Sequence, residues 1–416
     1  MLWLGKILLG MCLLVGVAVS PVKAKADAPQ PAITGEFGVA IDAVTGKILY
    51  NKNATKQGYP ASMTKVLSAI ILAEKLKDGE IVTASSQAVK QDPSNQAFLM
   101  QSGEQLSKED ALNAMMIKSS NDVTYAVAEK IAGNTKAFAQ LMNKKAKEIG
   151  AVNSNFVTPN GLHDDRHITT PYDMALIAKE ALKFPTVMKA MGAKEAVIHT
   201  NKRQVRIVNK SKIHDNPLAL GGKTGYTRKA QNTLVEILQK DGKTVIAVVM
   251  KTTLAQEYKD IAIMGNFAFN QLNVKNIVKK NQAVDSLKFK DVEVSLLSSQ
   301  DYSVTFKKGE KPGYKTQIQT FNHPNGFKAG DIVGNVNVIY QGRVIKQIPL
   351  KSNKDIIIPV KKEIKEASKN ENKQEQGAAH VSTIMMFLIS VGVPVAIYVG
   401  LIIVRNLRHR KSLGNI

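Results

Sequence analysis

Residues 60–72 carry the sequence PASMTKVLSAIIL, in which a polar turn runs directly into a block of apolar side chains. The segment Val66–Leu72 is apolar almost all round, which is typical of a helix buried at the centre of a domain. Ser62 and Lys65 are three residues apart at the start of this helix, so their side chains share one face within hydrogen-bonding reach. A serine hydroxyl becomes a nucleophile when a neighbour accepts its proton, and a lysine can do so if burial beside a second cation, such as Lys223, keeps it neutral. The sequence therefore predicts a nucleophile and its base at the start of a central helix.

Two further polar motifs lie where a cleft could form. The segment Ser119–Asn121 falls in a break between predicted helices at 111–118 and 122–131, where polar side chains can turn into a cleft. The segment Lys223–Gly225 opens a predicted edge strand, and the missing side chain of Gly225 would let a substrate backbone lie against that strand. Together with the first motif, these segments form the candidate site.

Strands are expected at both ends of residues 27–275, with helices between them. The expected elements, in chain order, are a hairpin at 37–50, helices to about residue 183 with a capping box at 107–110, strands near 223, at 233–238 and at 244–250, and a helix over 255–272. One antiparallel sheet accommodates this order if the N-terminal hairpin pairs beside the later strands. The expected fold class is α+β, an antiparallel sheet with a helical cluster and the site between them.

The rest of the chain predicts a second domain and a membrane anchor. Residues 289–360 form short alternating runs typical of a small all-β domain, and 361–380 have the polar composition of a linker. Residues 381–404 have no formal charge and, at 1.5 Å per residue, are long enough to cross roughly 30 Å of hydrocarbon as a transmembrane helix. The tail 405–416 is basic without an acid, which places it in the cytoplasm and the body of the protein outside the cell membrane.

The N-terminus indicates secretion. Residues 1–26 combine the cation Lys6, an apolar run and small residues around Ala24 and Ala26, the layout of a cleaved signal peptide. The single cysteine of the chain, Cys12, lies inside this segment. A mature protein without thiols excludes disulfides, thiolate metal sites and a cysteine nucleophile.

The net charge of +23, from 57 Lys+Arg against 34 Asp+Glu, must be interpreted with this location. A basic chain often binds nucleic acid, but a secreted domain has little access to it, so no nucleic-acid partner is expected. Anionic lipid or an acidic cell-wall polymer is the functional alternative. Lysine-rich solvated faces that bind nothing in particular are the simpler explanation, and the one we favour.

The three motifs in this order resemble those of the penicillin-binding protein and serine β-lactamase superfamily. The stretches most similar to low-molecular-mass D-alanyl-D-alanine carboxypeptidases are 37–42, 60–65, 119–122 and 222–227. The succession of signal peptide, catalytic domain, β-rich domain and C-terminal anchor is also similar to that family. The resemblance implies a β-lactamase/transpeptidase-like catalytic domain, and no cofactor or metal is expected.

The resemblance also implies roles for individual residues. Ser62 would be the acylated nucleophile, Lys65 its general base, and Ser119 the group that relays a proton to the leaving group. The substrate would be held by Asn121, Lys223, Thr224 and Gly225, and by the backbone N–H of Tyr226, which with that of Ser62 would bind the oxyanion. The implied reaction removes the terminal D-Ala from the pentapeptide stems of peptidoglycan and so limits cross-linking. β-Lactams would inhibit by acylating the same serine. Arg228 and Lys251 are the candidates for a further cation that binds the substrate carboxylate.

Three alternatives stay open at this point. A class A β-lactamase needs an E-x-x-L-N glutamate, and Glu109 begins such a sequence, although here it precedes the second motif instead of following it. A catalytically dead domain could bind peptidoglycan or a partner protein. His163 and His167 have the spacing of a metal pair, but they follow the turn signal Asn160-Gly161 without a third ligand, which favours a polar loop.

Overall fold

The computed structural model of the chain describes residues 29–93, 98–289, 292–324 and 326–357. The predicted signal peptide, the linker at 361–380, the apolar segment at 381–404 and the basic tail lie outside these ranges. Among the residues that are described, no helix is both long enough and apolar enough to cross a membrane.

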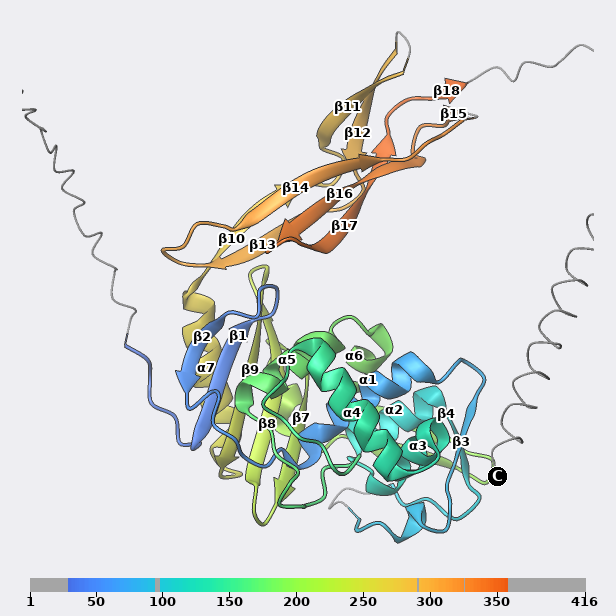
Figure 1. Cartoon of the computed structure of the whole chain (residues 1–416), viewed down its shortest axis with the longest axis vertical. Coiled ribbons are helices and arrows are strands. Elements are labelled where there is room, and N and C mark those ends of the chain that lie inside the picture. Colours follow the sequence, from blue (N-terminus) through green and yellow to red (C-terminus); the bar gives the residue numbers. More distant parts are fainter. Residues whose placement is uncertain (1–28, 94–97, 290–291, 325, 358–416) are drawn as a thin grey trace, which may run out of the picture. The chain divides into compact units, whose positions relative to one another are not determined.

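A five-stranded antiparallel sheet forms the centre of the first part of the chain (Figure 1). Its strand order is β2-β1-β9-β8-β7, with bounds β1 Phe37–Asp42, β2 Ile48–Lys52, β7 Ala219–Thr227, β8 Gln231–Lys240 and β9 Lys243–Thr252. The N-terminal hairpin joins the later strands through β1 and β9, where Val39 pairs with Val248. The predicted closure of the sheet is therefore confirmed, and β7 is one of its two edge strands.

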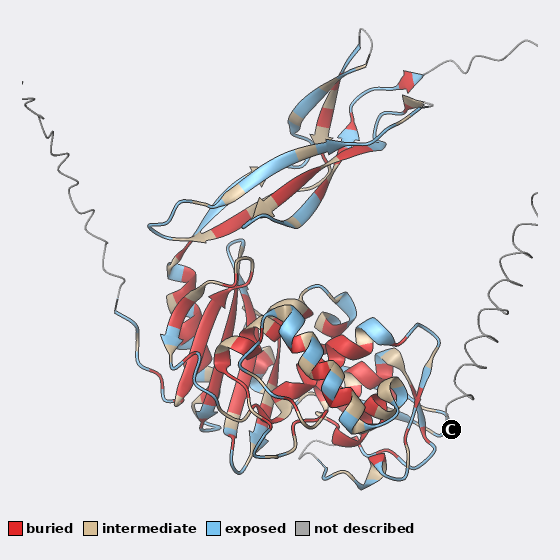
Figure 2. Ribbon diagram, viewed as in Figure 1, coloured by how far each residue is buried: buried red, intermediate tan, exposed pale blue. Residues whose placement is uncertain are grey.

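Helices cover both faces of this sheet. Their bounds are α1 Lys65–Lys75, α2 Lys108–Ile117, α3 Asn121–Ala132, α4 Thr135–Ile149, α5 Pro171–Ala181, α6 Pro185–Met191 and α7 Glu257–Asn270. The helix α7 packs on β8 and β9, whereas α5 packs on the opposite face of β1 and β9, and α1 is surrounded by α2, α3, α4 and α5. Alternate residues of a strand point to opposite faces, so Val248 joins the core around α1 while Val249 joins the core under α7. The strands β1, β8 and β9 are accordingly buried along most of their length (Figure 2).

Local sequence signals explain where the helices begin and end. Ser107 caps α2, with its Oγ accepting a hydrogen bond from the backbone nitrogen of Asp110 at 3.1 Å. The helices α3 and α4 end at Gly133 and Gly150, which adopt the left-handed conformation that suits glycine. The central helix α1 is buried from Lys65 to Leu72, as the almost entirely apolar run Val66–Leu72 predicts.

The strands from Leu272 onward build a second, all-β region with its own core. They are β10 Leu272–Val278, β11 Ala283–Phe289, β12 Val292–Ser298, β13 Tyr302–Lys307, β14 Tyr314–Thr320, β15 Gly326–Phe327, β16 Ile332–Tyr340, β17 Arg343–Ser352 and β18 Ile356–Ile357. The main sheet has the order β11-β12-β17-β16-β14, and side chains such as Leu296, Val336 and Ile348 fill its core. Strands begin at Leu272, earlier than the alternation from residue 289 predicted, because β10 and β11 are largely exposed and carry little apolar signal.

Two short antiparallel strand pairs extend the helical cluster. The strands β3 Ile81–Thr83 and β4 Gln105–Ser107 form one pair, and β5 Glu195–His199 and β6 Gln204–Val208 form another. An isolated bridge between Leu106 and Thr200 joins the two pairs. These strand pairs lie next to α2 and α3, the helices on either side of the second motif.

Candidate active site

A cavity of about 650 Å³ brings the three predicted motifs together. Among the residues lining it are Ser62, Ser119, Asn121, Lys223, Thr224, Gly225 and Tyr226. Lys65 does not line the cavity but lies directly behind Ser62, fully buried. The structure thus assembles all the candidate site residues around one open volume.

Ser62 lies in a single 3₁₀ turn, η1 Ala61–Thr64, which runs into α1. The sequence predicted that an α-helix begins here. In the structure the α-helix begins at Lys65, and Ser62 lies in the 3₁₀ turn before it. The turn is held by close backbone contacts: an added Cβ on Gly225 would lie 2.7 Å from the nitrogen of Ser62, and one on Gly161 would lie 1.9 Å from the oxygen of Ala61. Ala61 itself has a φ of 49°, a strained value for a residue with a side chain.

The amine of Lys65 is arranged to act as a base. Its Nζ lies 3.0 Å from Oγ of Ser62, 2.7 Å from Oδ1 of Asn121 and 2.7 Å from the carbonyl oxygen of Asn160. Burial, reinforced by the positive charge of Lys223, lowers the pKa of Lys65 well below its usual value. In its neutral form the amine has two N–H donors, one for each of the two carbonyl-type oxygens, and its lone pair would then face the hydroxyl of Ser62.

The second motif occupies the break between α2 and α3. Ser119 has a φ of 53°, which turns the chain sharply, and Asn121 is the first residue of α3. The amide nitrogen of the Asn121 side chain donates to the carbonyl of Asp92 at 2.7 Å, which leaves Oδ1 directed at Lys65. The side chain of Asn121 is therefore fixed at both ends.

The third motif lies in the middle of the edge strand β7, not at its start as predicted. Burial lowers the pKa of Lys223 to about 7, and the nearby carboxylate of Glu257 opposes this shift. Glu257 also lines the cavity, and burial raises its own pKa to about 7. Its Oε2 accepts a hydrogen bond from Nδ2 of Asn232 at 3.2 Å. Lys223 therefore carries a titratable charge at the cavity wall.

The two cations predicted to bind a substrate carboxylate do not line the cavity. Arg228 and Lys251 are not among the residues that line the cavity, and Lys251 is paired with Glu36 at 2.5 Å. Lys210 lines the cavity instead, on the segment that follows β6. Sequence reasoning missed Lys210 and Glu257 because neither belongs to a motif, and only the tertiary fold brings them to the cavity.

The histidine pair at 163 and 167 has a structural explanation. His167 is buried, its Nδ1 accepts from the backbone nitrogens of Val157 and Thr158, and its Nε2 lies 2.8 Å from Oγ1 of Thr64. Both ring nitrogens are thus in use, and burial lowers its pKa to about 4. Within the ranges described, no three His, Cys, Asp or Glu side chains gather to hold a metal ion.

The glutamate of the E-x-x-L-N sequence lies away from the cavity. Glu109 belongs to the first turn of α2 and pairs with Lys189 at 2.7 Å. Its side chain is 64% exposed, and it is not among the cavity-lining residues. This position gives it no access to a water molecule near Ser62, contrary to what a class A β-lactamase requires.

Comparison with known proteins agrees with this geometry. Residues 23–253 match the family model described as D-alanyl-D-alanine carboxypeptidase, over more than half of the chain. The chain belongs to this family. Residues 273–371 match a second model, the C-terminal domain of penicillin-binding protein 5.

Individual relatives of this carboxypeptidase family member cover most of its length. The D-alanyl-D-alanine carboxypeptidase DacF of Bacillus subtilis is 34% identical over 331 residues, which is 76% of this chain and 85% of that protein. DacA of Haemophilus influenzae is 27% identical, over 78% of this chain and 86% of its own. These matches extend from the catalytic part into the β-rich part.

Solved structures with the same fold include two whose identity is below 25%. The carboxypeptidase DacD from Francisella tularensis has a TM-score of 0.57 and 24% identity, covering 80% of this chain and 98% of that one. PBP3 from Streptococcus pneumoniae, described as a peptidoglycan synthesis regulatory factor, has a TM-score of 0.60 and 22% identity, covering 78% of this chain and 100% of that one. They place the sheet, the helical cluster and the β-rich part in a known fold.

Proposed function

We propose that this chain is a serine-type D-alanyl-D-alanine carboxypeptidase that removes the terminal D-Ala from peptidoglycan pentapeptide stems. The observation that carries the proposal is the fully buried amine of Lys65, which lies 3.0 Å from Oγ of Ser62 and whose pKa burial lowers well below its usual value. Family membership and the cavity that joins the three motifs support the same function.

Acylation follows from this arrangement. Oγ of Ser62 attacks the carbonyl carbon of the last peptide bond while its proton passes to Nζ of Lys65. The carbonyl oxygen becomes negative, and we assign the backbone N–H groups of Ser62 and Tyr226 as its donors. Ser119 then relays the proton from Lys65 to the departing amine, so D-Ala leaves with a neutral amino group before it protonates in water.

Deacylation reverses these steps with water in place of the amine. A water molecule attacks the ester carbonyl, its proton moves to the base, and the alkoxide of Ser62 regains a proton as the shortened stem leaves. Because Lys65 returns to its neutral form at the end of each half-reaction, the site needs no external acid or base.

The substrate's terminal carboxylate determines which peptide bond is cut. Lys223 and Lys210 are cations on the wall of the cavity, and Thr224 adds a hydroxyl beside them. We assign the carboxylate to this group and the amide of the stem to Asn121 and the edge of β7. A β-lactam presents a carboxylate and a reactive carbonyl to the same residues, so it would acylate Ser62 and inhibit the enzyme.

The location of the protein is part of the proposal. A signal peptide at 1–26 and an anchor at 381–404 would hold the catalytic domain at the outer face of the cell membrane, close to wall precursors. Trimming pentapeptide stems there removes donors for cross-linking, which would influence wall structure and cell shape.

The experiment that tests this function is mass spectrometry of the purified full chain, incubated with diacetyl-Lys-D-Ala-D-Ala and separately with benzylpenicillin. Release of one D-Ala together with a long-lived penicilloyl adduct, both absent in Ser62→Ala, would establish the carboxypeptidase. Rapid penicillin hydrolysis with the peptide intact would identify a β-lactamase instead. A protein that neither cleaves nor becomes acylated would be a binding module.

A further inference from the structure

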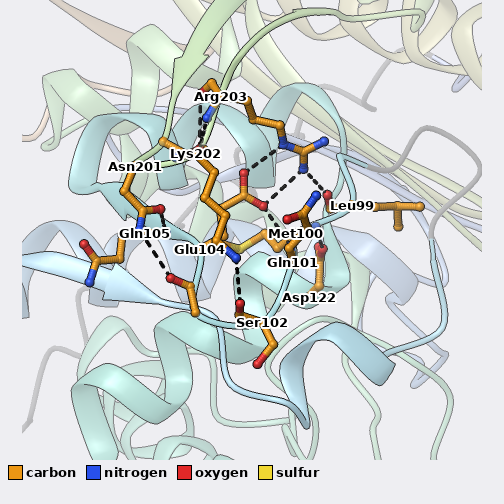
Figure 3. A network of polar contacts seen from close by, with 12 residues as sticks. Leu99, Met100, Gln101, Ser102, Glu104, Gln105, Asp122, Asn201, Lys202 and Arg203 are labelled. Atoms are coloured by element: carbon orange, nitrogen blue, oxygen red, sulfur yellow. Dashed lines mark hydrogen bonds and ion pairs between the residues drawn. The ribbon is translucent and has the colours of Figure 1, made fainter.

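A buried ion pair outside the cavity links the segment before α2 to the hairpin β5–β6 (Figure 3). Glu104 is completely buried, and its two carboxylate oxygens accept hydrogen bonds from Nε and Nη2 of Arg203 at 2.8 and 3.1 Å. Arg203 also donates to the carbonyl of Leu99 and lies over the ring of Phe98, 5.1 Å from its centre. A single guanidinium thus binds the segment at three points.

Two further contacts from the same hairpin reach the segment. Oδ1 of Asn201 accepts from the backbone nitrogen of Gln105 at 2.8 Å, and Nζ of Lys202 donates to the carbonyl of Ser102 at 2.9 Å. The tip of the β5–β6 hairpin therefore holds residues 98–105 along most of their length, as Figure 3 shows.

The opposite side of the same segment is bound to the start of α3. The backbone nitrogen of Phe98 donates to Oγ of Ser120 at 3.3 Å, and that of Met100 donates to Oδ2 of Asp122 at 2.7 Å. Ser120 and Asp122 are both buried. The segment lies between the Arg203 hairpin and the helix that begins at Asn121, so a displacement on one side is transmitted to the other.

The start of α3 requires such support. Ser119 adopts a φ of 53°, a conformation that costs about 1–3 kcal/mol for a residue with a side chain and persists only where its surroundings enforce it. On either side of Ser120, Ser119 and Asn121 belong to the candidate active site, whereas Ser120 and Asp122 bind the segment.

We propose that the Arg203–Glu104 pair is a positioning element for the active site, fixing Ser119 and Asn121 through residues 98–100. Neither member of the pair lines the cavity, so both act through other residues. The consequence for catalysis rests on the proposed carboxypeptidase function, while the mechanical linkage can be measured without it.

The test compares Arg203→Ala with Arg206→Ala in the full chain. Arg206 lies on the same hairpin and pairs with Glu195, but both side chains are exposed, so its loss removes a cation and an ion pair without touching the segment. We expect Arg203→Ala to lower kcat for diacetyl-Lys-D-Ala-D-Ala by roughly ten- to a hundredfold, because small misplacements of reacting groups reduce rates by this much. The rate at which a fluorescent penicillin acylates Ser62 should fall by a similar factor. Arg206→Ala should retain wild-type values, and Arg203→Lys should fall between the two.

Hydrogen exchange supplies a readout that does not depend on activity. In Arg203→Ala, and in Glu104→Gln if the alanine variant does not fold, exchange should rise at the amides of Phe98 and Met100 and at the first turn of α3, with α4 unchanged. Equal kinetic constants for the Arg203 and Arg206 variants, together with unchanged exchange in α3, would overturn the proposal. If the wild-type protein neither cleaves nor acylates, the proposed function fails, and the exchange data alone decide whether the linkage exists.

Discussion

A Cβ atom on Gly225 would lie 2.7 Å from the backbone nitrogen of Ser62, so the edge strand and the nucleophile turn are in direct contact. The sequence suggested that the missing side chain makes room for a substrate. The structure shows that it makes room for the nucleophile's own backbone. This contact fixes the N–H of Ser62 beside the strand that carries Lys223 and Tyr226, and would therefore determine the geometry of the proposed oxyanion site.

Gly225→Ala should consequently disrupt catalysis more than folding. The added methyl group would also lie 2.6 Å from Oγ1 of Thr233, so either the strand or the 3₁₀ turn must shift. We expect the rate of penicillin acylation to fall by about a hundredfold. Gly313→Ala is the matched control, because its Cβ would make only an ordinary contact of 3.5 Å with Tyr340. Acylation at the wild-type rate in Gly225→Ala would refute the tight contact.

The pH dependence of kcat/KM should have an alkaline limb set by Lys223. Its folded pKa is about 7, so its positive charge is lost as the pH rises through 7, and binding of a carboxylate weakens. On the acid side, activity should fall when the amine of Lys65 becomes protonated and can no longer accept the proton of Ser62.

Glu257→Gln tests the assignment of the alkaline limb. The carboxylate of Glu257 raises the pKa of Lys223, so removing its charge should move the alkaline limb to lower pH. Steady-state kinetics between pH 5 and 9 would measure this, with Glu148→Gln, on α4, as the control. A limb that stays in place or moves to higher pH would show that Lys223 is not the titrating group.

The sequence predicted those contacts of the site that join residues close together in the chain. Ser62 and Lys65 are separated by one helical turn, so their contact follows from spacing alone. Glu257 reaches the cavity because α7 packs on the sheet, and Lys210 because β6 leads into the segment at 209–211. Neither residue belongs to a local sequence pattern that would predict this position. The strands from Leu272 were missed because they are largely exposed and carry little apolar signal, and β10 also pairs with β13 instead of the next strand along the chain.

His167 should make the folded state sensitive to acid. Burial lowers its pKa from 6.5 to about 4, so the folded state resists a proton that the unfolded state accepts. Stability is therefore complete above pH 6.5 and falls as the pH is lowered toward 4, by about 3 kcal/mol from this group. Urea unfolding of wild type and His167→Gln at pH 7 and pH 4.5 would show a smaller pH effect in the variant. His199→Gln, which removes an exposed histidine at the end of β5, is the control and should keep the wild-type pH effect.

Glu109→Gln distinguishes the carboxypeptidase from a class A β-lactamase. In such a β-lactamase the glutamate of this motif activates the water that releases the penicilloyl group. Here Glu109 is exposed and paired with Lys189, so the release rate of the adduct, followed by mass spectrometry over hours, should be the same in the variant and in wild type. Lys189→Ala removes the same surface pair from the other side and should also leave the release rate unchanged. Loss of the pair should cost at most about 1 kcal/mol of stability, since exposed ion pairs contribute little. A severalfold slower release in Glu109→Gln alone would mean that the carboxylate reaches the acyl-enzyme, which its position on the first turn of α2 does not allow.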